Sequence, residues 1–144
     1  MKKLYVVGNK SSKSLSPTIF NHWFKKYNIK AKYRYLQLTE KNFHKKIKEV
    51  LEKKDTLGLN VTIPFKSKII KHLDKINNHA KKIGAVNCVT NKKTINGTNT
   101  DWTGYYKTLP SIKKTKKRKV IILGYGGASH AIHYVLKRGG LGIF

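Results

Sequence analysis

The sequence predicts an α/β fold, with a mainly parallel sheet and flanking helices, followed by the first strand, loop and helix of a second unit. Short β-like runs alternate with amphipathic helical runs along the 144 residues, which is the pattern of a layered α/β domain. Hydrophobic residues make up 39% of the chain and aromatic residues 10%, enough to bury a core, so a disordered chain is excluded.

Three strands and two helices are predicted in the first part of the chain. The strands cover residues 4–8, 33–38 and 57–61. Ser16 is the predicted N-cap of the first helix, because proline follows it and is favoured at the first helical position, and Thr39 is the predicted cap of the second. Both helices carry apolar residues at helical spacing, namely Ile19, Phe20, Trp23, Phe24 and Tyr27 in the first and Phe43, Ile47, Val50 and Leu51 in the second.

A helix, two strands and another helix are predicted next. The first of these helices carries Ile69, Ile70, Leu73 and Ile76. The strands cover residues 85–90 and 93–98, and the second helix begins near Trp102 and ends before Pro110. Residues 111–119 then hold six basic residues and no acidic one, which indicates an exposed linker. The predicted organisation is a domain at 1–110, a linker at 111–118 and an incomplete unit at 119–144.

The incomplete unit carries a glycine-rich loop between a strand and a helix. Residues 120–123 form a short, continuously apolar strand of the kind buried in parallel sheets. Gly124, Gly126, Gly127 and Ala128 follow, directly before a helix. Glycines let the backbone approach a pyrophosphate, and the helix N-terminus attracts anions, so the pattern predicts the start of a Rossmann-type dinucleotide-binding domain. The alternative is a tight turn that binds no ligand.

This strand and helix cannot bury their own faces. Either the rest of a second domain is missing, or the pair packs on the first domain. No Asp or Glu follows Asp101, so the acidic residue that holds the ribose in the usual dinucleotide motif is absent.

Polar residues beside predicted strand ends and helix starts form a candidate ligand site: Ser14, Ser16, Thr62, Lys66, Asn87 and Asp101. Ligands of open α/β sheets bind outside the carboxyl ends of the strands, where the segment 60–66 supplies an amide, a hydroxyl and an ammonium group. The two serines, near a helix N-terminus, suit a carboxylate. The aspartate is one of only six acidic residues and is a candidate catalytic carboxylate.

Each candidate also has a structural interpretation. Ser16, Thr62 and Asp101 have side chains that cap helices. Asn87 lies in a predicted apolar strand, where its amide is either a structural hydrogen-bonding group or a ligand contact. Lys66 is one of 29 lysines, and a single lysine is usually solvated surface.

Several other classes of site are excluded or disfavoured. The single cysteine, Cys88, rules out an intrachain disulfide and is predicted to be a small buried residue. The six histidines show no metal-site spacing and are interpreted as surface residues. No apolar run approaches the roughly 18 residues of a membrane-spanning helix, and the apolar run near the N-terminus is too short for a signal peptide. We therefore expect a cytoplasmic protein.

The formal net charge is +26 at pH 7, which is typical of nucleic-acid-binding proteins. Only three of the 32 basic residues are arginines, the residues preferred for bidentate contacts to bases and phosphates. An excess of Lys, Asn and Ile is what codon drift in an A+T-rich genome produces. We favour drift over a nucleic-acid partner.

Five motifs, taken in order and with their spacing, resemble the shikimate dehydrogenase family: Ser14-Leu15-Ser16-Pro17, Asn60-Val61-Thr62-Ile63-Pro64-Phe65-Lys66, Gly84-Ala85-Val86-Asn87, Asn99-Thr100-Asp101 and Gly124-x-Gly126-Gly127-Ala128-Ser129. The resemblance spans nearly the whole chain. It implies NADP-dependent reduction of 3-dehydroshikimate to shikimate, a step of chorismate and aromatic amino-acid biosynthesis.

The resemblance also assigns roles to the candidate residues. It implies that Ser14 and Ser16 hold the substrate carboxylate. It implies that Thr62 and Asn87 surround the ring hydroxyls together with Lys66 and Asp101, and that the latter two are the catalytic pair. The glycine loop is implied to hold the cofactor diphosphate.

Two features of the family are absent from the sequence: an Asn-Arg-Thr-type turn that reads the NADP 2′-phosphate, and a late glutamine that contacts substrate. The resemblance therefore favours a fragment that retains shikimate binding. A quinate/shikimate dehydrogenase that uses NAD is one alternative. A basic nucleic-acid-binding protein that uses residues 113–119 is another, although it lacks the aromatic residues among the basic ones that stack on bases.

Overall fold

The computed structural model describes residues 1–109, 119–139 and 142–143, so the predicted linker at 111–118 lies outside the described residues. In the described part no helix is long and apolar enough to span a membrane. The elements in chain order are β1 (Lys2–Gly8), η1 (Ser11–Lys13), α1 (Ser16–Lys26), β2 (Ala31–Gln37), α2 (Phe43–Leu51), β3 (Thr56–Val61), η2 (Lys68–His72), β4 (Lys75–Ile76), α3 (Asn78–Ile83), β5 (Cys88–Asn91), β6 (Ile95–Thr98), α4 (Asp101–Thr108), β7 (Lys119–Val120), α5 (Gly127–Arg138) and β8 (Gly142–Ile143).

A six-stranded sheet in the order β2-β1-β3-β5-β6-β4 forms the centre of the N-terminal part. Strand β1 pairs in parallel with both β2 and β3, and β4 pairs in parallel with β6. Strand β5 runs antiparallel to both of its neighbours, β3 and β6, and forms a hairpin with β6. The predicted α/β class and mainly parallel sheet are confirmed.

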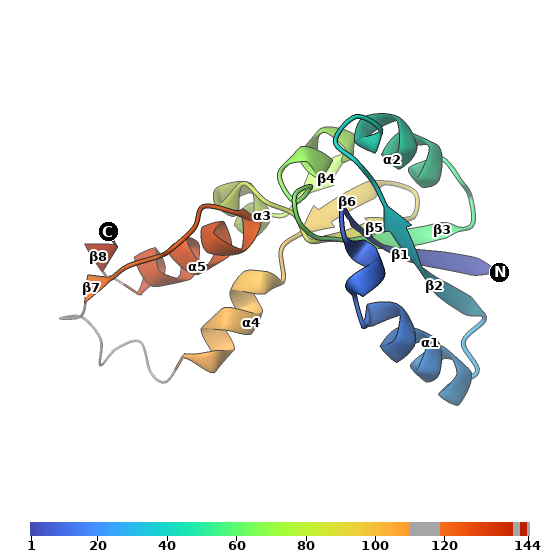
Figure 1. Cartoon of the computed structure of the whole chain (residues 1–144), viewed down its shortest axis with the longest axis horizontal. Coiled ribbons are helices and arrows are strands. Elements are labelled where there is room, and N and C mark those ends of the chain that lie inside the picture. Colours follow the sequence, from blue (N-terminus) through green and yellow to red (C-terminus); the bar gives the residue numbers. More distant parts are fainter. Residues whose placement is uncertain (110–118, 140–141, 144) are drawn as a thin grey trace.

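Helices cover the two faces of the sheet differently (Figure 1). Helix α2 lies on one face, and its predicted apolar residues Phe43, Ile47, Val50 and Leu51 are all buried, which confirms that prediction. Phe43 stacks on Phe65, from the loop after β3, with ring centroids 4.2 Å apart. This packing anchors the loop that follows β3 to the main core.

Helix α1 lies on the opposite face, where Phe20 stacks on Tyr33 of β2 with ring centroids 4.9 Å apart. The rest of its predicted apolar face is only partly buried: Ile19, Trp23 and Tyr27 keep 44%, 47% and 63% of their surface exposed. The reason is position, because α1 packs at the β1–β2 edge of the sheet with its outer side toward solvent.

The predicted caps of the first two helices are wrong. Ser16 is the first residue of α1 rather than its N-cap, and the Oγ of Ser14 accepts its N–H at 3.2 Å. In α2 the N-cap position is Asn42, whose Oδ1 turns back to accept the N–H of Thr39 at 2.9 Å. In both cases the predicted cap residue donates its own N–H to a neighbouring side chain in a local turn, Ser14 in the first case and Asn42 in the second.

The segment after Lys66 also differs from its prediction. The predicted helix through Ile76 is only the short 3-10 helix η2, and Ile76 lies in strand β4. The chain leaves the helix because Asp74 exchanges hydrogen bonds with the backbone of Ile95, which aligns β4 beside β6. Tertiary pairing overrides the helical spacing here.

Helix α3 is an element that the prediction missed. Its N-cap is Asn77, whose Oδ1 accepts the N–H of Ala80 at 2.8 Å. It ends at Gly84, which has a left-handed φ of 72° and closes the helix through its N–H. Both residues are ordinary end signals, but the helix holds only six residues and too few apolar positions to show a period.

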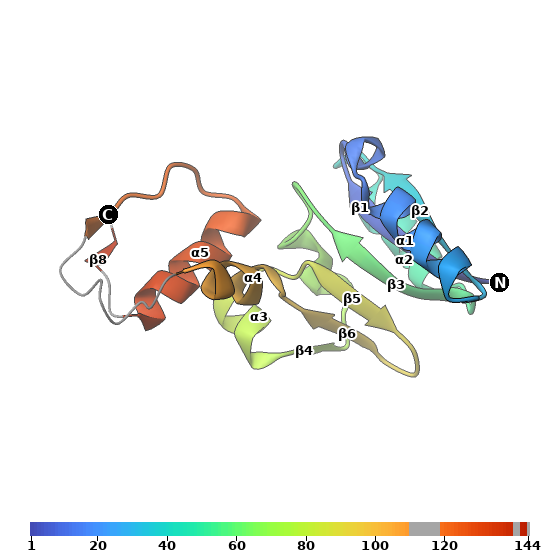
Figure 2. The ribbon, with the colours of Figure 1, turned by 90° about the horizontal axis from the view of Figure 1, so that it is seen from below.

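The second predicted unit is confirmed in its helix but not in its strand. Helix α5 buries Ala131, Val135 and Leu136, and it packs against α4 and α3 beyond one end of the main sheet (Figure 2). Strand β7 spans only two residues, and Leu123 of the predicted buried strand is 94% exposed. Within the part of the chain that the structure describes, β7 pairs only with β8, so it lacks the strands on both sides that a buried parallel strand has.

Two smaller predictions about single residues need correction. Cys88, predicted to be buried, is only half-buried in β5. The histidines are not all surface residues, because His72, His79 and His130 are each partly buried.

Helix α1 allows a test of which serine stabilises its start. We expect Ser14→Ala to lower the free energy of unfolding by about 1 kcal/mol, since it leaves the Ser16 N–H without its side-chain acceptor. Ser16→Ala removes only the hydroxyl–hydroxyl bond of 3.1 Å, so we expect it to cost a few tenths of a kcal/mol. Urea unfolding of both variants measures this. A larger loss for Ser16→Ala would restore the cap that the sequence predicted.

A histidine pair makes stability depend on pH. His44 of α2 and His72 of η2 share a hydrogen bond of 2.8 Å between ring nitrogens, and burial, with the neighbouring His44 ring, lowers the pKa of His72. As pH falls through about 6.5, the unfolded chain takes up the proton before the folded chain does, so the free energy of unfolding falls. We expect His72→Gln to flatten this decline in urea titrations between neutral and mildly acidic pH. Replacement of the exposed His22 by Gln is the matched control, and an equal effect there would contradict the assignment.

Candidate active site

The six polar candidates from the sequence come together around one cavity of about 460 Å³. The cavity lies where strands β1 and β3 end, which for parallel strands is the same edge of the sheet. Its lining residues are Val6, Lys10, Ser11, Lys13, Ser14, Ser16, Asn60, Val61, Thr62, Lys66, Asn87 and Asp101.

Close approach of two chain segments shapes the floor of this cavity. A Cβ on Gly8, the last residue of β1, would lie 2.5 Å from Cγ2 of Thr62 and 3.2 Å from the carbonyl oxygen of Ile63. Only glycine therefore lets the loop after β3 cross the end of β1 at this distance. Two backbone hydrogen bonds fix the crossing, from the Thr62 N–H to the Val7 carbonyl at 2.8 Å and from the Asn9 N–H to the Ile63 carbonyl at 3.1 Å.

An ion pair between Lys66 and Asp101 lies at the mouth of the cavity. The lysine Nζ is 2.8 Å from the aspartate Oδ2, and the two side chains keep 13% and 30% of their surface exposed. The other carboxylate oxygen, Oδ1, accepts a hydrogen bond of 2.7 Å from Nδ2 of Asn87. Both oxygens of Asp101 are thus engaged, which holds the ammonium group of Lys66 in one direction beside the cavity.

Asn87 and Asn99 hold the aspartate from behind. Asn87 was predicted to lie within a strand, but β5 begins one residue later; its Oδ1 accepts the N–H of Thr100 at 2.8 Å. Asn99 is 2% exposed; its Oδ1 accepts the N–H of Asp101 at 3.0 Å, and its Nδ2 donates to the Ala85 carbonyl at 2.9 Å. Asn99, and not Asp101 as the capping interpretation held, therefore accepts backbone N–H groups at the start of α4. The Asp101 carboxylate is left for the ion pair with Lys66.

Tyr33 and Asn60 extend the network into the core. The buried Tyr33 hydroxyl donates to Oδ1 of Asn60 at 2.6 Å, and Nδ2 of Asn60 reaches the Asn87 carbonyl at 3.5 Å. Burial, and to a lesser degree Cys88, raises the pKa of the Tyr33 phenol well above its usual value, so it remains a donor at neutral pH. A chain of hydrogen-bonding groups thus leads from β2 to the ion pair.

Sequence reasoning offered the Asn60 amide as part of the ligand site but assigned no role to Tyr33 or Asn99. The signal for Asn99 was an asparagine two residues before a helix start, where its side chain commonly accepts backbone N–H groups. Lys10 and Lys13 were also missed, because nothing in the sequence separates them from the other lysines.

The charge of the cavity favours an anion. Its lining has three lysines, Lys10, Lys13 and Lys66, against the single carboxylate of Asp101. The hydroxyls of Ser14 and Ser16 lie 3.1 Å apart at the N-terminus of α1, where the helix dipole is positive. The serine hydroxyls suit a carboxylate, and Lys66, which lines the same cavity, is a candidate proton donor.

The glycine-rich loop lies beside Lys66. Gly124 has a φ of 105°, which favours glycine, and both it and Gly126 face open space with no heavy atom within 4 Å of a built Cβ. No side chain caps the start of α5, and Ser129 Oγ donates to the Gly126 carbonyl instead. Of the predicted residues, Gly124 and Gly126 thus have open backbone, and Gly127 and Ala128 begin a helix without a side-chain cap, an arrangement that fits a diphosphate.

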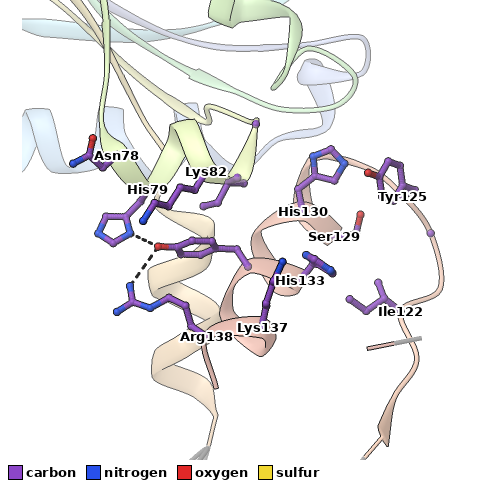
Figure 3. A pocket seen from close by; sticks show the side chains of 14 residues that line it. Asn78, His79, Lys82, Ile122, Tyr125, Ser129, His130, His133, Lys137 and Arg138 are labelled. Atoms are coloured by element: carbon purple, nitrogen blue, oxygen red, sulfur yellow. Dashed lines mark hydrogen bonds between the residues drawn. The ribbon is translucent and has the colours of Figure 1, made fainter. Parts of the chain in front are cut away.

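A separate groove of about 1120 Å³ runs between α3, α5 and the glycine loop (Figure 3). Its lining includes Lys82, Lys137 and Arg138 and no acidic residue. At its edge the Tyr134 hydroxyl bonds to Nδ1 of His79 at 2.7 Å and accepts from Arg138 at 3.3 Å, as the dashed lines of Figure 3 show. His79 also stacks on Trp102 of α4, so this cluster joins α5 to α3 and α4.

No group of three or more His, Cys, Asp or Glu residues that could hold a metal ion occurs within the described ranges.

Comparison with known proteins gives a consistent family. Residues 6–89 match the family model of the shikimate dehydrogenase substrate binding domain. Shikimate dehydrogenase (NADP(+)) from Staphylococcus aureus is 41% identical over 139 residues, which cover 94% of this chain and 51% of that protein.

Solved structures agree with the sequence matches. Shikimate dehydrogenase from Aquifex aeolicus superposes with a TM-score of 0.87 at 34% identity, over 100% of this chain and 55% of that one. Shikimate 5-dehydrogenase from Thermus thermophilus, solved in complex with NADP(H) and shikimate, has a TM-score of 0.79 at 28% identity, over 99% and 54%. The chain spans about half the length of the curated relatives it matches. On the family model, the relatives and the fold together, the chain belongs to the shikimate dehydrogenase family.

Proposed function

We propose that this chain binds shikimate in the cavity at the ends of β1 and β3, and that this cavity is the substrate half of an NADP-dependent shikimate dehydrogenase. The observation that carries the proposal is the Lys66–Asp101 ion pair of 2.8 Å, supported by Asn87, in one cavity with Ser14 and Ser16. The relatives support it through their names and through the Thermus thermophilus complex with shikimate.

The proposed roles follow from the chemistry of each group. The hydroxyls of Ser14 and Ser16 bind the substrate carboxylate, with Lys10 and Lys13 supplying positive charge nearby. Thr62 and Asn87 bind ring hydroxyls, which have both donor and acceptor character. Together these contacts orient the ring so that its reacting oxygen lies at Lys66.

Lys66 is the proposed acid. Reduction of the 3-dehydroshikimate ketone places a hydride on the carbonyl carbon, and the developing alkoxide takes a proton from the Lys66 ammonium. Asp101 holds that ammonium in direction and balances its charge before the transfer. In the reverse reaction the neutral amine accepts the proton of the shikimate hydroxyl.

The cofactor belongs to the proposal as well. NADPH, when bound, supplies the hydride. Gly124, Gly126, Gly127 and Ala128 are the residues proposed to hold its diphosphate, because they present uncapped N–H groups at the start of α5. The proposed organisation is a substrate-binding domain at 1–110, a linker at 111–118 and the first strand, loop and helix of a dinucleotide-binding unit at 119–144.

Shikimate binding tests the substrate site directly. We expect calorimetry to detect shikimate binding by the 144-residue chain, and Lys66→Ala to weaken it about tenfold, since a charge-assisted hydrogen bond is lost. Lys92→Ala, which removes an exposed lysine in the β5–β6 turn, is the matched control. Equal affinities for the two variants would mean that Lys66 does not contact shikimate.

Turnover tests the proposed fragment. Since the chain spans about half the length of its relatives, we expect it to bind shikimate yet to oxidise NADPH with 3-dehydroshikimate at little more than the background rate. Absorbance of NADPH at saturating substrate measures this, with Lys66→Ala as the blank. Robust turnover that Lys66→Ala abolishes would show that these residues form a complete enzyme.

A further inference from the structure

Two adjacent glycines at the start of α5 have opposite surroundings. A Cβ built on Gly126 meets no heavy atom within 4 Å. A Cβ built on Gly127 would lie 2.9 Å from both Cβ and Cδ of Lys66 and 3.3 Å from its Cγ. Approaches under 3.0 Å are essentially never seen for real Cβ atoms, so a side chain at residue 127 requires Lys66 or the helix to move.

Backbone conformation does not explain the glycine at 127. The described glycines with a left-handed φ are Gly84 and Gly124, and Gly127 is not among them. Gly127 is the first residue of α5, where any residue adopts the helical conformation. The space occupied by the Lys66 stem is therefore the structural reason for glycine at this position.

The Lys66 side chain is held at both ends. Its stem lies against the backbone of Gly127, and its Nζ binds Oδ2 of Asp101 at 2.8 Å. With only 13% of the side chain exposed, it has little room to take another path to the same aspartate. The first turn of α5 thus packs against the Lys66 stem and limits the directions that the ammonium group can take.

We propose that Gly127 is a positioning residue for Lys66, and that this contact couples the glycine-rich loop to the substrate cavity. A ligand that shifts the loop, such as a diphosphate compound, changes the position of Lys66 and so the affinity for shikimate. By thermodynamic reciprocity shikimate changes the affinity for that ligand by the same factor. The coupling to shikimate rests on the proposed function, whereas the contact between Gly127 and Lys66 does not.

Paired alanine substitutions test the proposal in the full chain without any nucleotide. We expect Gly127→Ala to weaken shikimate binding about tenfold in calorimetry, because the displaced ammonium loses its charge-assisted hydrogen bond. Gly104→Ala, at an exposed glycine of α4 outside the site, also adds a methyl group but meets open space, so its affinity stays within about twofold of the unaltered chain. Equal affinities for the two variants would overturn the proposal.

A second comparison separates positioning from general damage to the fold. In an Asp101→Asn background the ion pair is already weakened, so adding Gly127→Ala has less than its full effect if it acts through Lys66. The same tenfold loss in both backgrounds would mean that Gly127→Ala acts elsewhere, and would overturn the proposal.

A third measurement does not depend on shikimate. In the unliganded chain, nuclear Overhauser contacts between the Gly127 α-protons and the Lys66 methylene groups report the contact, and the carboxyl ¹³C shift of Asp101 reports the ion pair. Gly127→Ala moves that shift and Gly104→Ala leaves it in place. If the unaltered chain fails to bind shikimate, the proposed function is wrong, and an unmoved Asp101 shift would then overturn the positioning role separately.

Discussion

The ion pair of Lys66 and Asp101 is the interaction on which the arrangement of the site depends. It ties the loop after β3 to the start of α4, two segments 35 residues apart in the chain. Behind the aspartate, Asn87 donates to the carboxylate, and Asn99 accepts the Asp101 N–H while it donates to the Ala85 carbonyl. On the other side of Lys66, Gly127 brings α5 against the lysine stem. Lys66 therefore contacts both the start of α4 and the start of α5.

The fold was largely predictable wherever the local spacing of apolar residues agrees with the tertiary packing. Helix α2 shows this, because the spacing of Phe43, Ile47, Val50 and Leu51 matches the face that the core needs. The pattern failed at Ile76, where pairing with β6 prevailed over helical spacing, and at α3, which is too short to show a period. The strand predicted at 120–123 required neighbouring strands on both sides, and the described part of the chain supplies one.

The candidate site was predictable in its chemistry but not in its support. The motifs placed all six polar residues, from Ser14 to Asp101, at strand ends and helix starts, and the structure brings them to one cavity. The buried residues that support them could not be predicted. Tyr33 and Asn99 act through a hydroxyl and an amide whose partners, Asn60 and the Ala85 carbonyl, are set by strand pairing and by the crossing of loops. The position of Asn99 before a helix start indicates only that it accepts backbone N–H groups, and nothing in the sequence indicates the partner of Tyr33, since Tyr is equally ordinary in either setting.

The half-exposed face of α1 has a consequence for how molecules of this chain behave toward one another. Ile19, Trp23 and Tyr27 follow each other at intervals of four residues and form an apolar stripe in contact with water. Two such stripes attract, while two chains of net charge +26 repel. The repulsion acts only over a Debye length, about 8 Å at physiological ionic strength, whereas the apolar attraction is not screened. The colloidal stability of the chain is therefore set by ionic strength, and the same lysines that draw anions to the cavity keep its molecules apart.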